Sequence, residues 1–256
     1  MKLVAYHLRK ALLELFTTTK YRLILIGLVL IAAFISVSEL GVAKLFTKII
    51  LHEGSLSHLR LFVYVSAFFL FFGATRGAHF LQRIYRVNVF DKAFKESKSE
   101  VSGFKDSWRW SLAFELTTLL STFTQLGVIV IFFTIFNWKF GLINLIVLLI
   151  VFEIYGRLFK NQLEAQRGFV IASKNKSPVA NHVRIGSRIK SGEFGILISG
   201  VALIFLLGAL IYSSYIGEVS KSNAIVLFFG LRMQNSNLSN ISTSLMRFAR
   251  ARTNSE

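Results

Sequence analysis

Long apolar runs separated by clusters of charged residues dominate the pattern of this 256-residue chain. A helix needs ~20 mainly apolar residues to cross ~30 Å of hydrocarbon. Two runs without Asp, Glu, Lys or Arg reach this length, Leu116–Trp138 with 23 residues and Phe194–Gly217 with 24. Four more reach it if one interior charge is accepted: Leu23–Ile50, Leu61–Gln82, Phe140–Phe159 and Ser222–Met246. The pattern therefore predicts an all-α, polytopic membrane protein with six transmembrane helices.

The first residues form a different pattern. Val4, Leu8, Ala11 and Leu15 recur at helical spacing, with Lys10 on the opposite side. This is typical of an amphipathic helix that lies in the membrane interface. We expect an N-terminal elbow helix at 1–19 and a six-helix transmembrane domain at 20–256. Its spans are expected at about 20–50, 60–82, 111–137, 139–159, 192–217 and 222–246.

The segments between the spans differ in length. On one side, the turns around 137–139 and 217–222 are short enough for tight antiparallel hairpins. On the other, the loops at about 83–110 and 160–191 are long and rich in helix formers, with breakers at Gly103 and Pro178. We expect the helices to continue beyond the membrane there, with a short cross-helix in each loop.

Composition agrees with a membrane protein and charge gives the orientation. The chain has 54% hydrophobic and 17% charged residues, whereas soluble domains carry about 25% charged residues. The net charge of +17 would suggest nucleic acid in a soluble protein. Here 23 of the 30 Lys and Arg lie on one side of the spans. The distribution predicts a multi-pass protein of the bacterial inner (cytoplasmic) membrane with both termini in the cytoplasm, contacts with anionic lipids, and no nucleic-acid partner.

Sequence signatures of enzymes are missing. The chain contains no G-x-x-x-x-G-K-[S/T] phosphate loop, no H-x-x-x-H pair among its five histidines, and no cysteine. We therefore expect no catalytic residue, no metal site and no cofactor in this chain, which is not predicted to be an enzyme.

Polar residues inside the spans are candidates for function, because each is costly in hydrocarbon. The sixth span has the most: Arg232, Gln234, Asn235, Asn237 and Asn240. One interpretation is a helix that lines a wet pathway, and the alternative is a cytoplasmic amphipathic segment that begins near Arg232.

Two charged residues of other spans are also candidates for function. Arg76 shares one face of the second span with His79, which indicates close packing or a cavity wall. Glu115 lies at the start of the third span, near the cytoplasmic surface of the membrane. There a solvated position is as good an interpretation as a functional one.

Several stretches of the chain are similar to segments of one known family. They are SELGVAKLFTKII after the first span, the hairpin FFTIFNWKFGLINLIVLLI, Gly186-Ser-Arg-Ile189-Lys190, and IGEVSKSNAIVLFFGL with SLMRFARART near the end. Together with the elbow helix and the two broken loops, they resemble the transmembrane domain of exporter-type ABC transporters (type I exporter fold). The nucleotide-binding domain of that family has no counterpart up to Glu256.

The resemblance implies a permease subunit that moves a substrate with ATP hydrolysed by a separate subunit. Its implied partners are ATPase subunits that bind ATP and Mg, and a second copy of the chain or a homologous membrane subunit. Its implied substrate pathway comprises Arg232, Gln234, Asn235, Asn237, Asn240, Arg76 and Glu115. Its implied ATPase-coupling loops contain Ser97, Val101, Phe104, Pro178, His182, Arg184 and Arg188.

Two other functions fit the same pattern. A transporter of this fold without an ATPase could be driven by protons, which requires carboxylates along the pathway, and Glu39, Glu115 and Glu153 are the candidates. A membrane scaffold that does not transport is the third interpretation, favoured by cytoplasmic loops that look shorter than those usual in the family that the chain resembles.

Overall fold

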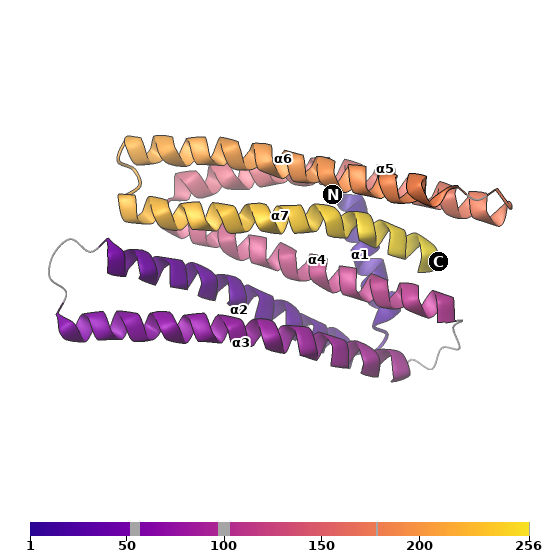
Figure 1. Cartoon of the computed structure of the whole chain (residues 1–256), viewed down its shortest axis with the longest axis horizontal. Helices are drawn as coiled ribbons and strands as arrows, with labels where there is room; N and C mark the ends of the chain where they lie inside the picture. Colours follow the sequence, from indigo (N-terminus) through magenta and orange to yellow (C-terminus); the bar gives the residue numbers. More distant parts are fainter. Residues whose placement is uncertain (52–56, 97–102, 178, 256) are drawn as a thin grey trace.

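Every regular element in the described part of the chain is an α-helix. The computed structural model describes residues 1–51, 57–96, 103–177 and 179–255. Its helices are α1 (Lys2–Leu15), α2 (Thr19–Ile50), α3 (His58–Glu96), α4 (Gly103–Phe136), α5 (Trp138–Lys174), α6 (Asn181–Tyr215) and α7 (Lys221–Ser255) (Figure 1). The predicted all-α fold class is confirmed for these residues.

Five of the described helices, α2 to α6, are long and apolar enough to cross a bilayer. The chain is therefore a multi-pass helical membrane protein. The shortest of the five has 32 residues and the longest 39, which correspond to about 48–58 Å of helix. Since the hydrocarbon layer is only ~30 Å thick, each helix extends beyond it. The loops expected at 83–110 and 160–191 are accordingly mostly helical.

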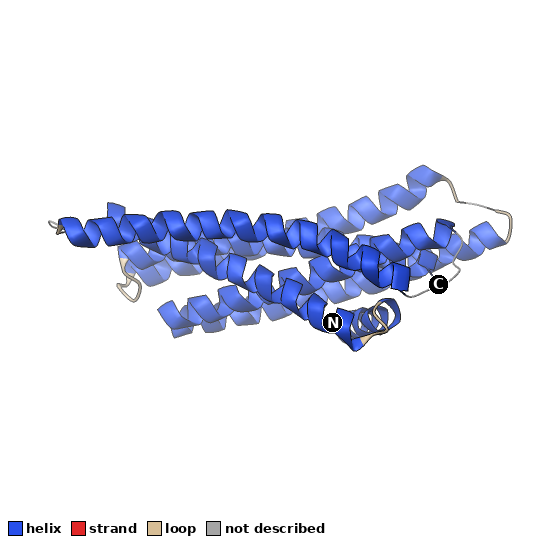
Figure 2. Cartoon of the chain, turned by 90° about the horizontal axis from the view of Figure 1, so that it is seen from below, coloured by secondary structure: helices blue, strands red, loops and turns tan. Residues whose placement is uncertain are grey.

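Helices α2 to α7 run up and down, with each antiparallel to the next (Figure 1). The last turns of α2, α4 and α6 and the first turns of α3, α5 and α7 lie at one end, on the left in Figure 1. The last turn of α7 lies at the other end, which we call the C-terminal end, together with the last turns of α3 and α5 and the first turns of α4 and α6. Helix α1 crosses the bundle on one side and is seen nearly end-on in Figure 2.

Helix α7 differs from the five apolar helices. It coincides with the predicted sixth span, but its composition is too polar to meet the same criterion. It nevertheless has 35 residues, lies alongside its neighbours, and contacts α2, α4, α5 and α6. These helices cover one side of α7, so that the polar groups on that side face protein rather than lipid.

The two predicted tight turns are present at the end opposite the C-terminus. Asn137 caps α5, because its side-chain oxygen accepts a hydrogen bond from the Phe140 backbone N–H at 2.9 Å. Gly217 closes α6 with a φ of 80°, a conformation that glycine adopts without strain. An ion pair between Lys139 and Glu218 joins the two turns.

The short cross-helix that the sequence predicts in the second long loop is not found in the described residues. Helix α5 continues to Lys174 and α6 begins at Asn181, and no helix occurs in residues 175–177 and 179–180 between them. The helical legs leave too few residues there for a helix and two turns. The corresponding segment of the first loop, 97–102, and Pro178 lie outside the described residues.

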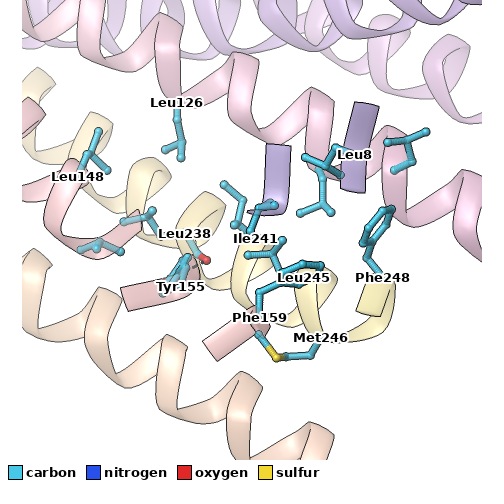
Figure 3. Close-up of a cluster of buried hydrophobic side chains, with 14 of the residues drawn as sticks. Leu8, Leu126, Leu148, Tyr155, Phe159, Leu238, Ile241, Leu245, Met246 and Phe248 are labelled. Carbon is cyan, nitrogen blue, oxygen red and sulfur yellow. Dashed lines mark hydrogen bonds between the residues drawn. The ribbon is translucent and has the colours of Figure 1, made fainter. Parts of the chain in front are cut away.

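The core is formed where α1, α4, α5 and α7 meet. Leu8 of α1 and Tyr155 and Phe159 of α5 lie around Leu245 and its neighbours in α7, and Leu126 of α4 extends this core farther along the bundle (Figure 3). Val4, Leu8, Ala11 and Leu15 of α1, which recur at helical spacing in the sequence, are buried against this core. The helix begins and ends within the predicted segment 1–19.

Candidate functional site

Helix α7 carries polar side chains on two opposite sides. Gln234, Asn237, Ser242 and Ser244 are buried against the neighbouring helices. A second set lies on the outer side between α4 and α6, at a spacing of three or four residues that places it in one line: Arg232, Ser236, Asn240, Thr243 and Arg247. The two sets have different surroundings.

The buried set joins the helices to one another. Asn144 of α5 and Gln234 exchange two amide hydrogen bonds, of 3.0 and 2.7 Å. The Tyr155 hydroxyl lies 3.0 Å from the Gly195 carbonyl oxygen of α6, to which it donates, and 3.2 Å from that of Leu238. Satisfied polar pairs of this kind hold membrane helices together, so Gln234 has a structural role in this arrangement.

Two amides of α7 are less well satisfied. Asn235 is half-buried and Asn237 is 8% exposed. The Asn235 Oδ1 and Asn237 Nδ2 atoms have no hydrogen-bond partner in the part of the chain that the structure describes. A buried amide without a partner costs about 1–3 kcal/mol, so these two positions are candidates for contact with water or a ligand.

The outer set reaches a charged group on α4. Arg247 lies 3.5 Å from the Glu115 carboxylate, whose side chain is only 13% exposed. Arg86 of α3 and Arg188 of α6 also act on this carboxylate electrostatically. Glu115 is therefore an acid among arginines from three other helices, rather than the freely solvated residue of one interpretation above.

Helix α3 adds a row of basic residues. Arg76, His79, Arg83 and Arg86 recur every three or four positions and share one flank of the helix. Arg86 donates to the Thr118 hydroxyl of α4 at 3.3 Å, so this flank is on the side of α4. A cavity of about 490 Å³ is lined by Arg76, His79 and Arg83 with Phe80 and Ile84.

An acid of α2 pairs with this row. The Glu39 carboxylate lies 3.4 Å from Nε2 of His79, and both side chains are partly exposed. An acid and a base that face each other reduce the cost of placing either one at membrane depth.

We call these residues together the polar face of the protein. Its members are Arg76, His79, Arg83 and Arg86 of α3, Glu115 of α4, and Arg232, Ser236, Asn240, Thr243 and Arg247 of α7. Glu115 connects the two rows, because Arg86 and Arg247 approach it from α3 and α7. Sequence reasoning missed Arg83, Arg86 and Arg247, which it assigned to cytoplasmic segments. Their helical spacing from Arg76 and Asn240 was the available signal.

The residues predicted to contact an ATPase lie at the C-terminal end. His182, Arg184 and Arg188 occupy the first turns of α6, and His182 is exposed. Phe104 belongs to the first turn of α4. Ser97, Val101 and Pro178 lie outside the described residues.

No known protein family and no curated protein matches this sequence. Among the residues described, no group of three His, Asp or Glu side chains is arranged to hold a metal ion.

Proposed function

We propose that this chain is the membrane-spanning half of an exporter-type ABC transporter, with α7 as the sixth transmembrane helix. It works as a dimer, and a separate subunit hydrolyses ATP. Both termini lie in the cytoplasm of a bacterial cell, since the basic residues concentrate at the C-terminal end.

The polar face is the observation that carries this proposal. Five arginines and a histidine share it with Glu115, and Glu39 of α2 pairs with the histidine. Charged side chains at membrane depth face water or protein rather than lipid. Other surfaces are apolar, as on α5, where Leu142, Ile146 and Leu149 are at least half-exposed. Two copies that meet across their polar faces would enclose a water-filled pathway and leave the apolar surfaces in lipid.

The polarity of α7 supports the same arrangement. A helix beside a central pathway needs polar groups on the side that faces the pathway and firm attachment to other helices on the opposite side. Helix α7 has both. In this proposal Arg232, Asn240, Arg76 and Glu115 face the pathway, while Gln234 fixes α7 to α5. Asn235 and Asn237 lie outside the polar face.

A cysteine-labelling experiment tests the water-filled pathway. The chain contains no cysteine, so Asn240→Cys provides a single thiol on the polar face. We expect a charged maleimide to label it at least ~10-fold faster than Ile146→Cys on α5, because only a hydrated thiol ionises to the reactive thiolate. Rates are measured in inside-out and right-side-out vesicles, and the faster rate is compared.

Ser177→Cys, in the exposed turn after α5, gives the rate for a fully hydrated thiol. A rate for Asn240→Cys as slow as that for Ile146→Cys in both kinds of vesicle would contradict a water-filled pathway.

The ATPase partner is tested by purification from the native membrane. A tagged chain is expected to copurify with an ATPase subunit at a ratio of two to two. Replacing the exposed His182 and the nearby Arg184 with Ala should reduce the copurified ATPase, whereas Lys139→Ala at the opposite end should not. A purified complex without any ATPase would exclude this form of the proposal.

A further inference from the structure

Three arginines gather at the C-terminal end, where they outnumber the nearby carboxylates of Glu115 and Glu193. Arg184 and Arg188 are one turn apart on α6, and the charges of both act on Arg250 of α7. None of the three forms an ion pair with another described residue. Arginines that repel one another in this way favour an anion between them.

A small cavity lies beside these arginines, between α6 and α7. Its volume is about 150 Å³. Arg188 and Arg247 line it together with Thr243, whose hydroxyl accepts a hydrogen bond from Arg247 Nη2 at 3.3 Å. Ile189 and Met246 form an apolar part of the wall. The cavity therefore offers hydrogen-bond donors and apolar surface at the same place.

The cavity lies close to α1. The sequence pattern of α1 is that of a helix between headgroups and acyl chains, so we expect the cavity to lie at the same level. The last turn of α1 is joined to α7 by the ion pair between Glu14 and Arg252. Arg247 is five residues before Arg252, so the cavity is within two helical turns of α1.

An aliphatic stripe continues from the cavity along α6 toward the other end of the bundle. Glu193 is at the cavity, and the exposed side chains of Leu197, Val201 and Ile204 follow it at helical spacing, with 61%, 58% and 71% exposed. A ligand with a charged head and an apolar chain matches a basic cavity that is followed by an aliphatic stripe, whereas a water-soluble anion would use only the cavity.

We propose that this cavity binds the phosphate of an anionic membrane phospholipid through Arg188 and Arg247, with an acyl chain along the aliphatic stripe. Basic pockets between transmembrane helices bind such headgroups on the cytoplasmic side. Arg184, Arg188, Arg247 and Arg250 outnumber Glu115 and Glu193 there, and this excess of positive charge favours an anionic headgroup over a zwitterionic one. Binding of a lipid at this site does not require that the protein is a transporter.

The test is the thermal unfolding midpoint of the full chain in an uncharged detergent, titrated with four probes. They are dihexanoyl phosphatidylglycerol, dihexanoyl phosphatidylethanolamine, dihexanoylglycerol and inorganic phosphate. A ligand that binds only the folded state raises the midpoint. We expect phosphatidylglycerol to act at the lowest concentration, and Arg188→Gln to raise its half-saturating concentration about 10-fold, which is the loss of one charged hydrogen bond.

Two further variants separate the head from the chain. Leu197→Ser leaves the arginines in place, so it should weaken phosphatidylglycerol but not phosphate. Arg167→Gln removes an exposed arginine of α5 at the same end and should change neither. Half-saturation by phosphate or dihexanoylglycerol at the same concentration as by phosphatidylglycerol would overturn the lipid site. An unchanged titration of Arg188→Gln that unfolds at the wild-type midpoint would overturn it as well.

Discussion

Replacing Gly195 with valine is expected to destabilise the protein more than any other single change considered for it. A Cβ atom at Gly195 would overlap the Ser242 side chain of α7 and lie 3.3 Å from Cε1 of Tyr155. The contact joins α5, α6 and α7, and separating the helices would also stretch the bonds from Tyr155 to the Gly195 carbonyl and from Ser242 to that of Gly192. Overpacking with two weakened hydrogen bonds costs roughly 2–6 kcal/mol.

The same helix provides a matched control for this variant. A Cβ atom at Gly200 meets nothing within 4 Å, so Gly200→Val changes the sequence in the same way without the clash. Monodisperse yield in detergent and the thermal unfolding midpoint measure both variants. We expect Gly195→Val to lose most of the folded protein and Gly200→Val to retain it. Equal behaviour would mean that α6 and α7 do not pack closely at Gly195.

Replacing Glu14 with glutamine is expected to loosen α1 from α7. Arg252 is 2% exposed, and its Nη2 donates to the Glu14 carboxylate at 3.1 Å. Without the carboxylate, a buried guanidinium loses a charged partner. Removing one partner of a fully buried ion pair lowers the free energy of unfolding by about 3–5 kcal/mol, but Glu14 is half-exposed. We therefore expect a loss near the lower end of the roughly 1.5–3 kcal/mol found for charged hydrogen bonds.

The pH dependence of this pair follows from the pKa of Glu14. The hydrogen bond from Arg252 lowers the pKa of this carboxyl below its ordinary value of 4.5. The stabilisation is therefore complete above about pH 4.5 and is lost as the pH falls through the lower pKa of the folded state. The difference in unfolding midpoint between the wild type and Glu14→Gln should shrink in acid.

A second acid gives the control for this titration. Glu164 faces Lys160 at 4.0 Å in an exposed pair, and such pairs contribute little. Glu164→Gln is expected to leave the unfolding midpoint unchanged across the range. A Glu14→Gln midpoint that matches the wild type at neutral pH would show that α1 is held by its apolar side alone.

Much of the fold follows from the sequence. Uncharged runs such as Leu116–Trp138 predict spans directly, because a bilayer allows little other than a helix at that length and polarity. The N-terminal helix was equally accessible, since the spacing of Val4, Leu8, Ala11 and Leu15 defines its buried side. The lengths of the loops were less accessible, because α3 and α5 continue well past their apolar runs.

The candidate site was predicted only in part. The polar residues of α7 stand out in any apolar chain, but composition cannot say which side of the helix each one occupies. Gln234 and Asn240 are equally polar in sequence, yet Gln234 is bonded to Asn144 and Asn240 is exposed. Arg86 and Arg247 were missed because their partners on α4 are 29 and 132 residues away in sequence, as counted to Glu115.

The sequence by itself determined that this chain is a bundle of long membrane helices with a short amphipathic helix at its start. Hydrophobic length and periodicity are local properties, and the bilayer converts them into helices without reference to the rest of the chain. Only the tertiary structure decided which polar groups of α7 are satisfied inside the protein and which form the polar face. That division depends on contacts between α3, α4, α5, α6 and α7, and such contacts exist only once the helices have packed.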